Sequence, residues 1–515
     1  MDHNFARAFL FLLVSSTESA KVLLITGPTF SHCSEVSAVG HALLNNGHSV
    51  FILVGSTFDH KHCFDKVRNG SARIEPIFIT DSPDVTPPEK IAKVMTSSMT
   101  DGKEFSFFSY LPLVRDFSRT PCTNLFYDKQ VQDRLKRERF DIAIVDTVPF
   151  TYCFFLLPRK LGIPYVGMSS VFEDFATGRP FLPSVIPSLL VNFSDSMSFF
   201  ERLLNTLNYI GLNVLGRFSQ DMDVIREVDQ DLTRQDMIDL AAKCELYLYN
   251  YDVILSYPVP MMPNHVMVGG ITAGPAQPLP PVLNDFYQRV KDGVILVTFG
   301  SNVGDLSQKT SDIMKGALRR FNTNVLWKQE TEGEDGNIKT MKWLPQNDLL
   351  GNPKTKVFVS HCGNNGVFEA LYHGVPLVCT VLYGDQFYNG VRVERWKAGR
   401  TLSLLTASEE DVYEAINDVL TDPVYRRNMK KASEMYHSQP MTAHQRAAFW
   451  IEHVLNYGSA HLRSKASEMS TLVYMGYDVV FFVFGSVVLT TVLSAKCIFM
   501  LLKRFCCRKD KVKTN

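Results

Sequence analysis

The sequence predicts an α/β protein with two facing parallel sheets, followed by one membrane-spanning helix. The first observation is a strand at VLLIT (22–26), a helical period over 35–46 and a second strand at SVFILV (49–54). This order forms a βαβ unit, which implies a parallel sheet covered by helices. The second observation is that the same alternation stops at 269–283 and then starts again. The third is an apolar run over 479–502, close to the end of the chain.

Residues 21–268 are expected to form the first α/β domain. Gly47 is placed to end its first helix, because glycine commonly follows the last helical residue. Two more buried strands are expected, at FDIAIVD (140–146) and IPYVGM (163–168). The first of these ends in Asp146, so that a carboxylate is expected at the C-terminal edge of the sheet.

Residues 269–283, GGITAGPAQPLPPVL, predict an interdomain linker because they are rich in Gly and Pro and lack periodicity. A second α/β domain is expected over 284–440, with closing helices and a juxtamembrane segment over 441–477. Ligands of open α/β sheets bind beyond the C-terminal ends of the strands, so two facing sheets predict a cleft between those ends. The expected strands of the second domain are 293–299, 324–329, 356–360 and 376–381.

Both ends of the chain carry apolar segments. Residues 1–20 have the layout of a signal peptide, and their apolar run is too short to cross a bilayer. Residues 478–502 would form a transmembrane helix, since about 36 Å of helix suffices for a bilayer. A buried strand and a buried core helix are the respective alternatives. The tail, 503–515, is basic and is expected to stay cytosolic.

These ends predict a single-pass type I protein with its folded domains in the lumen and a lipid bilayer as partner. The last five residues, KVKTN, match the di-lysine pattern of retrieval to the endoplasmic reticulum, which is an address read by receptors. Asn69 and Asn192 begin sequons and are glycosylation candidates.

The chain has 515 residues, with 53 basic and 53 acidic side chains, so its net charge gives no electrostatic case for a nucleic-acid partner. Three of the ten cysteines lie in or after the apolar C-terminal run. The other seven are odd in number and show no paired spacing. Mostly free, buried thiols are therefore expected rather than a disulfide scaffold.

The stretch SHCGNNGVFEALYHGVPLVC, residues 360–379, carries the main functional signal. A strand is expected to deliver the chain to His361, and the loop HCGNNG then leads to a helix over 367–373. A glycine-rich turn lets backbone amides approach a ligand, and the following helix N-terminus favours an anion such as a pyrophosphate. Asn365 and Glu369 share a helix face, where a Glu can accept hydrogen bonds from a ribose diol.

Other chemistries fit this stretch poorly. His361 and Cys362 are adjacent and no second His or Cys pair is near, so no metal site is expected. Cys362 at a helix N-terminus could have the reactivity of a nucleophile, but a small loop filler is the favoured interpretation. A dinucleotide-dependent oxidoreductase would need G-x-G-x-x-G after the first strand, and GPTFSHCSE lacks it.

Four motifs together resemble the signature of UDP-glycosyltransferases: WLPQ at 343–346, SHCGNNGVFE at 360–369, HGVP at 373–376 and GDQ at 384–386. More narrowly, the chain is similar to the animal, membrane-bound group that includes the UDP-glucuronosyltransferases, and the similarity covers nearly its whole length. The resemblance implies two facing Rossmann-like domains of the GT-B type. The sequence departs from the animal pattern at Cys362, where Gly is usual, and at Asn364.

The resemblance also implies a binding site for a UDP-sugar. Trp343 would stack on the uracil, as an aromatic face suits a flat base, and Gln346 would hydrogen-bond nearby. Glu369 would bind the ribose. Asn365 and Gly366 belong to the turn that would bind the diphosphate. The remaining donor contacts would be Ser301 and His361 to phosphate, and Asp385 and Gln386 to the sugar hydroxyls.

The catalytic base is expected from the first domain. His32 lies in the loop expected after strand 22–26, and the family has a His there as general base, with an Asp at a strand end that bonds its other ring nitrogen. Asp146 matches that Asp by position. A neutral imidazole can take the acceptor proton, and the carboxylate fixes its tautomer and stabilises the imidazolium.

The expected reaction is a single inverting displacement without metal or cofactor, in which the UDP-sugar is a co-substrate. Glucuronate is the favoured sugar, with UDP-glucose, UDP-xylose and UDP-N-acetylglucosamine as alternatives. The acceptor is expected to be a small lipophilic hydroxyl compound, bound by the stretches around 95–120 and 170–215, which contain Phe199 and Phe200. A homo- or hetero-oligomer is possible, and the alternative of another class is a non-catalytic regulatory membrane subunit that binds UDP-sugar.

Overall fold

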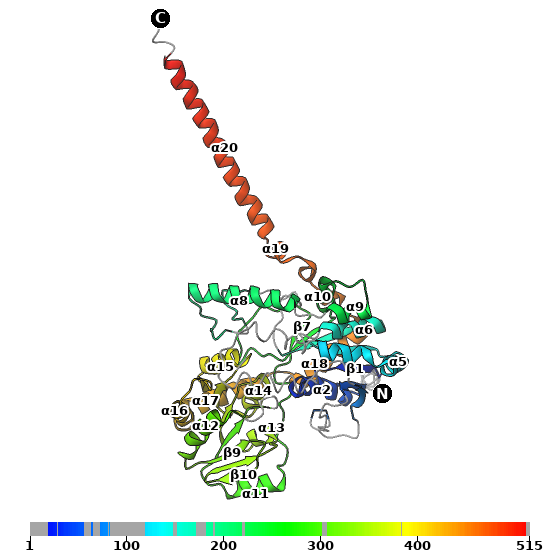
Figure 1. Ribbon diagram of the computed structural model, residues 1–515, viewed down its shortest axis with the longest axis vertical. Coiled ribbons are helices and arrows are strands. Elements are labelled where there is room, and N and C mark those ends of the chain that lie inside the picture. Colours follow the sequence, from blue (N-terminus) through cyan, green and yellow to red (C-terminus); the bar gives the residue numbers. More distant parts are fainter. Residues whose placement is uncertain are drawn as a thin grey trace, which may run out of the picture. The chain divides into compact units, whose positions relative to one another are not determined.

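The computed structural model describes residues 19–27, 29–55, 63–64, 73–80, 82, 119–147, 152–170, 182–188, 191–218, 222–300, 306–382 and 384–510. The chain divides into two compact units, Met1–Leu462 and Arg463–Asn515 (Figure 1). The expected signal peptide up to residue 18, the sequon at Asn69, the phosphate-site residue Ser301 and the last five residues lie outside the described part of the chain.

The first domain contains a parallel sheet of seven strands in the order β3-β2-β1-β4-β5-β6-β7. The central strand β1 pairs with β2 and β4, placing Leu23 opposite Phe51 and Leu24 opposite Ile144. The strands are β1 (Lys21–Ile25), β2 (Ser49–Gly55), β3 (Glu75–Ile79), β4 (Ile142–Asp146), β5 (Tyr165–Ser169), β6 (Tyr247–Tyr249) and β7 (His265–Met267).

Both faces of this sheet are buried, because alternate residues of β1 point to opposite sides and all but the first are apolar and buried. Leu23 and Ile25 face a core formed with α5, α6, α9 and α10, while Val22 and Leu24 face α2 and the later helix α18 (Ala443–Tyr457). These helices, with the others of the domain, are α2 (Phe30–Asn45), α5 (Lys129–Glu138), η2 (Tyr152–Phe155), α6 (Leu156–Leu161), α8 (Phe199–Phe218), α9 (Met222–Val228) and α10 (Arg234–Ala242).

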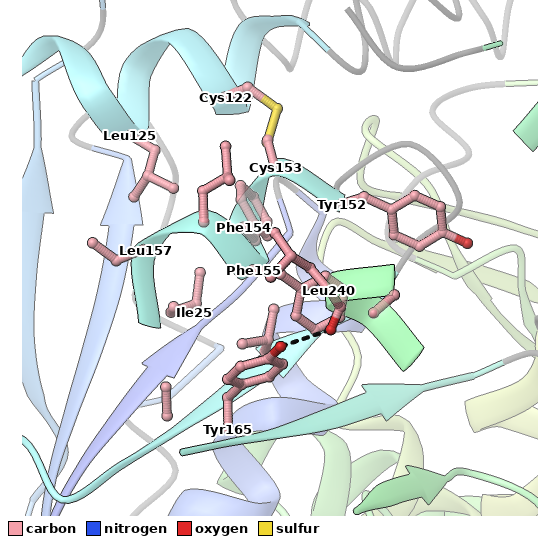
Figure 2. Packing of buried hydrophobic residues seen from close by; sticks show 14 of the residues in the cluster. Ile25, Cys122, Leu125, Tyr152, Cys153, Phe154, Phe155, Leu157, Tyr165 and Leu240 are labelled. Atoms are coloured by element: carbon pink, nitrogen blue, oxygen red, sulfur yellow. Dashed lines mark hydrogen bonds between the residues drawn. A yellow bond between two sulfur atoms is a disulfide. The ribbon is translucent and has the colours of Figure 1, made fainter. Parts of the chain in front are cut away.

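Aromatic side chains fill the first of these cores. Phe155 and Tyr165 are in ring contact with centroids 5.6 Å apart, and the Tyr165 hydroxyl donates to the Leu240 carbonyl at 2.7 Å (Figure 2). Burial of a phenol requires such a partner, since an unpaired hydroxyl in this environment would cost about 1–3 kcal/mol. The bond also fixes α10 against β5.

The second domain has a sheet of the same size, in the order β10-β11-β9-β8-β12-β13-β14. Its pairs are parallel except for β10 with β11. The alternation along β8 again buries both faces, with Val294 and Leu296 on one side and Ile295 and Val297 on the other. The strands are β8 (Val294–Thr298), β9 (Asn324–Lys328), β10 (Gly333–Asp335), β11 (Ile338–Met341), β12 (Thr355–Ser360), β13 (Leu377–Val381) and β14 (Gly399–Ser403).

Helices α11, α13, α14 and α17 contribute to one core of this sheet, and α12 and α16 to the other. The following helix, α18, contributes Ala447 and Ile451 to the first domain's core beside α2, so the chain returns to its first domain (Figure 1). The helices are α11 (Pro281–Arg289), α12 (Gln308–Arg319), α13 (Gln346–Leu350), α14 (Asn364–His373), α15 (Gln386–Arg395), α16 (Glu409–Thr421), α17 (Pro423–His437), α18 (Ala443–Tyr457) and the short η3 (Ala460–Leu462).

The second unit is mostly helical. Its long helix α20 (Tyr477–Asp510) contains the segment Tyr477–Arg504, which is long and apolar enough to cross a membrane. None of that segment's 18-residue apolar window is buried, as expected for a helix whose solvent is lipid rather than a protein core. Two short elements precede it, η4 (Lys465–Glu468) and α19 (Thr471–Tyr474).

The expectation of mostly free thiols is wrong. Three disulfides are present, Cys33–Cys63, Cys122–Cys153 and Cys362–Cys379, while Cys244 and Cys497 are the free cysteines among the described residues. Sequence spacing could not reveal the pairs, because 17 to 31 residues separate the partners. Sheet formation brings them together: Ser360 pairs with Cys379, and this places Cys362, two residues further on, within 5.2 Å of it between Cα atoms.

Candidate active site

His32 and Asp146 meet at the C-terminal edge of the first sheet. Asp146 is the last residue of β4 and is buried, and its Oδ1 lies 2.9 Å from His32 Nδ1. His32 does not lie in a loop, as the sequence had indicated, but in the first turn of α2, which begins at Phe30. The helix starts early because the chain turns directly from β1 at Thr29, the N-cap residue.

Gly27 makes this pair possible. Its backbone N–H donates to Asp146 Oδ2 at 2.8 Å, so each carboxylate oxygen has a partner. A Cβ at position 27 would overlap Asp146 Oδ2, and only glycine allows the backbone this close approach. Sequence analysis missed Gly27, because the required closeness exists only once β1 and β4 are paired.

The electrostatics of His32 are set by three acids. Burial lowers the pKa of His32, but the charge and hydrogen bond of Asp146, with smaller contributions from Glu35 and Asp385, raise it to about 9. Asp146 belongs to β4, Glu35 to α2 and Asp385 to the residue before α15, so both domains act on one imidazole. The acids stabilise the imidazolium, the form that a general base reaches after taking a proton.

The second domain presents His361 at the tip of β12. Its ring lies between two glycines, since a Cβ on Gly300 would come within 2.7 Å of the ring and one on Gly363 within 2.5 Å. Gly300 also has φ +77°, a conformation natural to glycine. The helix α14 begins directly afterwards at Asn364, three residues earlier than expected, so its first amides lie beside His361.

A cation adjoins this histidine. Lys328, the last residue of β9, donates to the Gly300 carbonyl at 2.6 Å and lies 5.6 Å from the centroid of the Trp343 ring. Burial lowers the pKa of Lys328. Burial and the Lys328 charge also lower the pKa of His361 to about 4, which keeps its imidazole neutral near pH 7. The sequence had placed no cation here, because Lys328 and Gly300 are 28 positions apart in the chain.

Trp343 is partly exposed rather than a core residue, with 38% of its surface accessible. Phe30 of α2 contacts its edge, with ring centroids 5.7 Å apart. This contact joins the first turn of the His32 helix to the residue expected to bind uracil. The accessible surface leaves room for a planar partner such as a base.

Gln346 and Glu369 lie together, as their expected roles require. Gln346 Nε2 donates to Glu369 Oε2 at 2.6 Å, and Thr298 donates to Gln346 Oε1. Glu369 is buried on α14, and Gln346 begins α13. The chain of bonds fixes the carboxylate of Glu369, and the Gln346 amide of this chain lies against Gly366, where a Cβ would come within 3.4 Å of Nε2.

The two asparagines that open α14 bond to the first domain. Asn365 accepts from Asn250 Nδ2 at 2.7 Å, and Asn364 donates to the Asn250 backbone carbonyl, also at 2.7 Å. Arg392 in turn donates to Asn364 at 3.2 Å. The departure from the animal pattern at Asn364 therefore has a structural reason: its buried side chain links the two domains.

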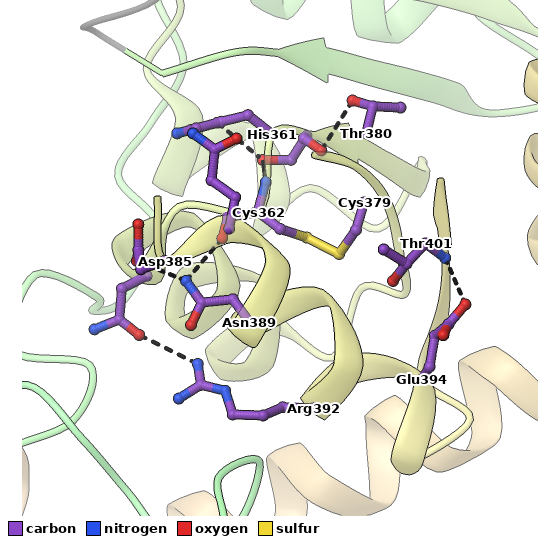
Figure 3. Close-up of a disulfide and its surroundings, with 12 residues drawn as sticks. His361, Cys362, Cys379, Thr380, Asp385, Asn389, Arg392, Glu394 and Thr401 are labelled. Atoms are coloured by element: carbon purple, nitrogen blue, oxygen red, sulfur yellow. Dashed lines mark hydrogen bonds between the residues drawn. A yellow bond between two sulfur atoms is a disulfide. The ribbon is translucent and has the colours of Figure 1, made fainter. Parts of the chain in front are cut away.

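Cys362, the other departure, is not a filler. It has φ +57°, which favours glycine, and its disulfide to Cys379 holds it in this conformation (Figure 3). Asn389 donates to the Cys362 carbonyl at 2.9 Å and to Asp385 at 2.8 Å. Asn389 thus connects Cys362, in the turn expected to bind the diphosphate, to Asp385, the acid expected to bind the sugar. The disulfide holds the same turn against β13.

Asp385 and Gln386 differ in accessibility. Burial raises the pKa of Asp385, which is half-buried, and the charge of His32 opposes this increase. Gln386 is almost fully buried and accepts from the Leu382 backbone N–H at 2.8 Å. Asp385 is thus the better placed of the two for a ligand. Among the described residues, no group of three or more His, Cys, Asp or Glu side chains is arranged to hold a metal ion.

Solved structures show which fold this is. The glycotransferase of kitacinnamycin superposes with a TM-score of 0.55 at 14% identity, over 85% of this chain and 99% of that one. The glycosyltransferase VinC in complex with DTDP gives a TM-score of 0.54 at 14% identity, over 85% and 98% of the two chains. The fold is therefore that of the two-domain GT-B glycosyltransferases, as the sequence predicted.

Sequence relatives identify the family. The family described as UDP-glucoronosyl and UDP-glucosyl transferase matches residues 20–512. UDP-glucuronosyltransferase 2C1 of Oryctolagus cuniculus is 34% identical, over 82% of this chain and 84% of its own. UDP-glucuronosyltransferase 2B15 of Homo sapiens is 28% identical, over 99% and 98%. The chain belongs to this family and is a UDP-glycosyltransferase, which confirms the resemblance inferred from the sequence.

Proposed function

We propose that this enzyme transfers glucuronate from UDP-glucuronate to a hydroxyl group of a small lipophilic acceptor, with inversion and with His32 as general base. The observation that carries the mechanism is the His32–Asp146 pair, 2.9 Å apart, on which Asp385 of the donor domain also acts. His32, the base of the first domain, and Asp385, an acid of the second domain, would then both lie at the reacting centre. No metal takes part in the proposed step.

In this mechanism the free Nε2 of His32 takes the proton of the acceptor hydroxyl as its oxygen attacks the anomeric carbon. Asp146 holds Nδ1 and so fixes the tautomer in which Nε2 is the acceptor of the proton. The positive charge that develops on the ring is stabilised by Asp146 and, through space, by Glu35 and Asp385. Asp146 orients the imidazole and does not itself take the proton.

The departing diphosphate would be stabilised on the opposite side. The neutral imidazole of His361 can donate a hydrogen bond, and the first amides of α14 offer further donors together with the helix dipole. Lys328 adds the positive charge. A cation and oriented donors facing the developing charge are the usual means of stabilising such a leaving group.

Glucuronate is favoured for the donor because the sequence relatives bear the name UDP-glucuronosyltransferase. Lys328 suits an anionic donor but lies on the diphosphate side, so it does not distinguish among sugars. UDP-glucose, UDP-xylose and UDP-N-acetylglucosamine are the alternatives. Incubation of the membrane-bound enzyme with each UDP-sugar and one lipophilic phenol decides between them, and the sugar with the highest kcat/KM is the donor.

The lipophilic acceptor is proposed from the aromatic side chains of the two expected acceptor stretches. Phe199 and Phe200, expected beside the acceptor, are largely exposed at the start of α8. Residues 95–118 of the other expected acceptor stretch lie outside the described residues. Their side chains are accessible to an apolar ligand, and the expected contact of these two residues with the acceptor stays a prediction.

We also propose a lumenal orientation in the membrane of the endoplasmic reticulum. The three disulfides support it, because such bonds form in oxidising compartments. The single apolar helix and its basic end support a cytosolic tail. The sequon residue Asn192 is exposed, as glycosylation would require. Oligomerisation stays a prediction.

The mechanism is tested by His32→Ala. We expect kcat to fall by about 10²–10⁴-fold, which is the range for a general base, while the affinity for UDP stays within about twofold. Retained UDP binding shows that the donor domain is folded. His41→Ala is a matched control. His41 lies further along α2 than His32, and its ring hydrogen-bonds to the Phe64 carbonyl instead of an acid. Turnover by His32→Ala equal to that of the control would refute the assignment.

A further inference from the structure

Glu35 is a buried acid beside the reacting groups that the mechanism above uses only through its charge. It lies three residues after His32 on α2, so the two side chains share a helix face. Only 2% of Glu35 is exposed, which excludes direct contact with an acceptor. A carboxylate so deeply buried is costly unless it is well bonded.

The partners of Glu35 come from the ends of two adjacent strands. Ser170, directly after β5, donates to Glu35 Oε2 at 2.5 Å, and the side-chain Nδ2 group of Asn250, directly after β6, acts on the same carboxylate and lowers its pKa. The two side chains hold the carboxylate at the same sheet edge as the catalytic pair.

Asn250 extends this connection to the donor domain. The same Nδ2 donates to Asn365 at 2.7 Å in the first turn of α14, and Asn250 Oδ1 accepts from Gly270 N–H at the start of the interdomain segment. Asn250 is fully buried. An amide that has a partner on both sides cannot turn without breaking one of these bonds.

We propose that Glu35 is a positioning residue for the transfer step: its carboxylate, held by Ser170 and Asn250, supports the charge that forms on His32 and connects the base to the turn of the donor domain that holds the diphosphate. This inference rests on the proposed function.

The charged groups around this site are few. The described acids that act on His32 are Asp146, Glu35 and Asp385, and the groups that act on Glu35 are His32 and Asp146. Two of the elements packed on α2, the strands β1 and β2, contribute only apolar side chains to the core that they share with this helix. The helix α18 bears Glu452, which bonds His48 beyond the far end of α2. Removal of the Glu35 charge should therefore act on His32 with little compensation.

The test is Glu35→Gln in the full-length, membrane-bound enzyme, with kcat/KM for the acceptor followed against pH. Glutamine keeps the size of the side chain and can still accept from Ser170, but it lacks the charge. We expect the pH at which His32 loses its proton to fall by about one pH unit, the low end for a charge within about 4–6 Å. Glu35→Asp, which restores the charge, should restore most of that pH dependence.

Glu245→Gln is the matched control, because Glu245 also accepts from a serine hydroxyl, that of Ser459, but lies before β6 at the opposite edge of the sheet. An unchanged pH dependence in Glu35→Gln, or an equal change in Glu245→Gln, would overturn the inference. If kcat/KM of the wild-type enzyme does not depend on pH, or if the same pH dependence remains in His32→Ala, the proposed function is instead refuted.

Discussion

Asp146→Asn is the perturbation that tests the electrostatics of the catalytic pair most directly. In the native enzyme the pKa of His32 is raised from 6.5 to about 9, and Asp146 gives the largest favourable contribution, by charge and by hydrogen bond. An increase of this size corresponds to about 3 kcal/mol of preferential stabilisation of the imidazolium. Asparagine removes the charge, and burial then favours the neutral ring.

Two effects on the rate follow. In the wild-type enzyme, kcat/KM should increase about tenfold for each pH unit until His32 is neutral at about pH 9. In Asp146→Asn this increase should end at a clearly lower pH, because only the smaller contributions of Glu35 and Asp385 then oppose the effect of burial on His32. The plateau should fall by about 10²–10⁴-fold, since the imidazolium formed in the transition state has lost its partner.

The assay is the initial rate of UDP release between about pH 5.5 and about pH 10, with an acceptor that has no ionisable group in that range. The same pH dependence in both enzymes would refute the reasoning. Stability gives an independent reading. His32 has a raised pKa in the folded state, so its contribution is fully present below about pH 6.5 and is lost as the pH rises through about 9. In Asp146→Asn this decrease in thermal stability should be much smaller and should occur at lower pH.

Three further variants test other parts of the site. Gly27→Ala should reduce kcat with little change in UDP affinity, because a Cβ would displace Asp146; normal turnover would contradict the close-approach argument. Trp343→Ala should weaken UDP binding by about 1–3 kcal/mol in calorimetry, the range for base stacking, whereas Trp343→Phe should retain most of it. Replacement of Cys362 and Cys379 by Ala should lower the free energy of unfolding by about 3 kcal/mol, since the disulfide closes a loop of this size; an unchanged melting temperature would contradict this.

The proximity of the residues predicted to bind the donor was largely predictable, because they belong to two motifs close together in the sequence. Trp343, Gln346, His361 and Glu369 lie within 27 positions, counted from the first to the last, and the strand–turn–helix pattern places them at one sheet edge. Gln346 and Glu369 do bond to each other. Such local order is encoded in periodicity and turn residues, which a sequence displays directly.

The errors fell where the outcome depended on pairing between distant segments. The free-thiol prediction failed at Cys362 and Cys379, since their approach follows from the register of β12 with β13. Lys328 was not assigned a role, because its ammonium reaches Gly300 only after β9 and β8 are paired. Neither fact has a signal in residue spacing.

The sequence by itself determined the two sheets, the apolar helix near the C-terminus, the family and the identity of the candidate base and its acid. These depend on patterns of apolar residues and on short motifs, which are local properties of the chain. The tertiary structure alone decided that three acids act on His32 and that Glu35 is connected through Asn250 to the first turn of α14. Electrostatic and hydrogen-bond energies depend on distance in space, and folding sets that distance for residues that lie hundreds of positions apart.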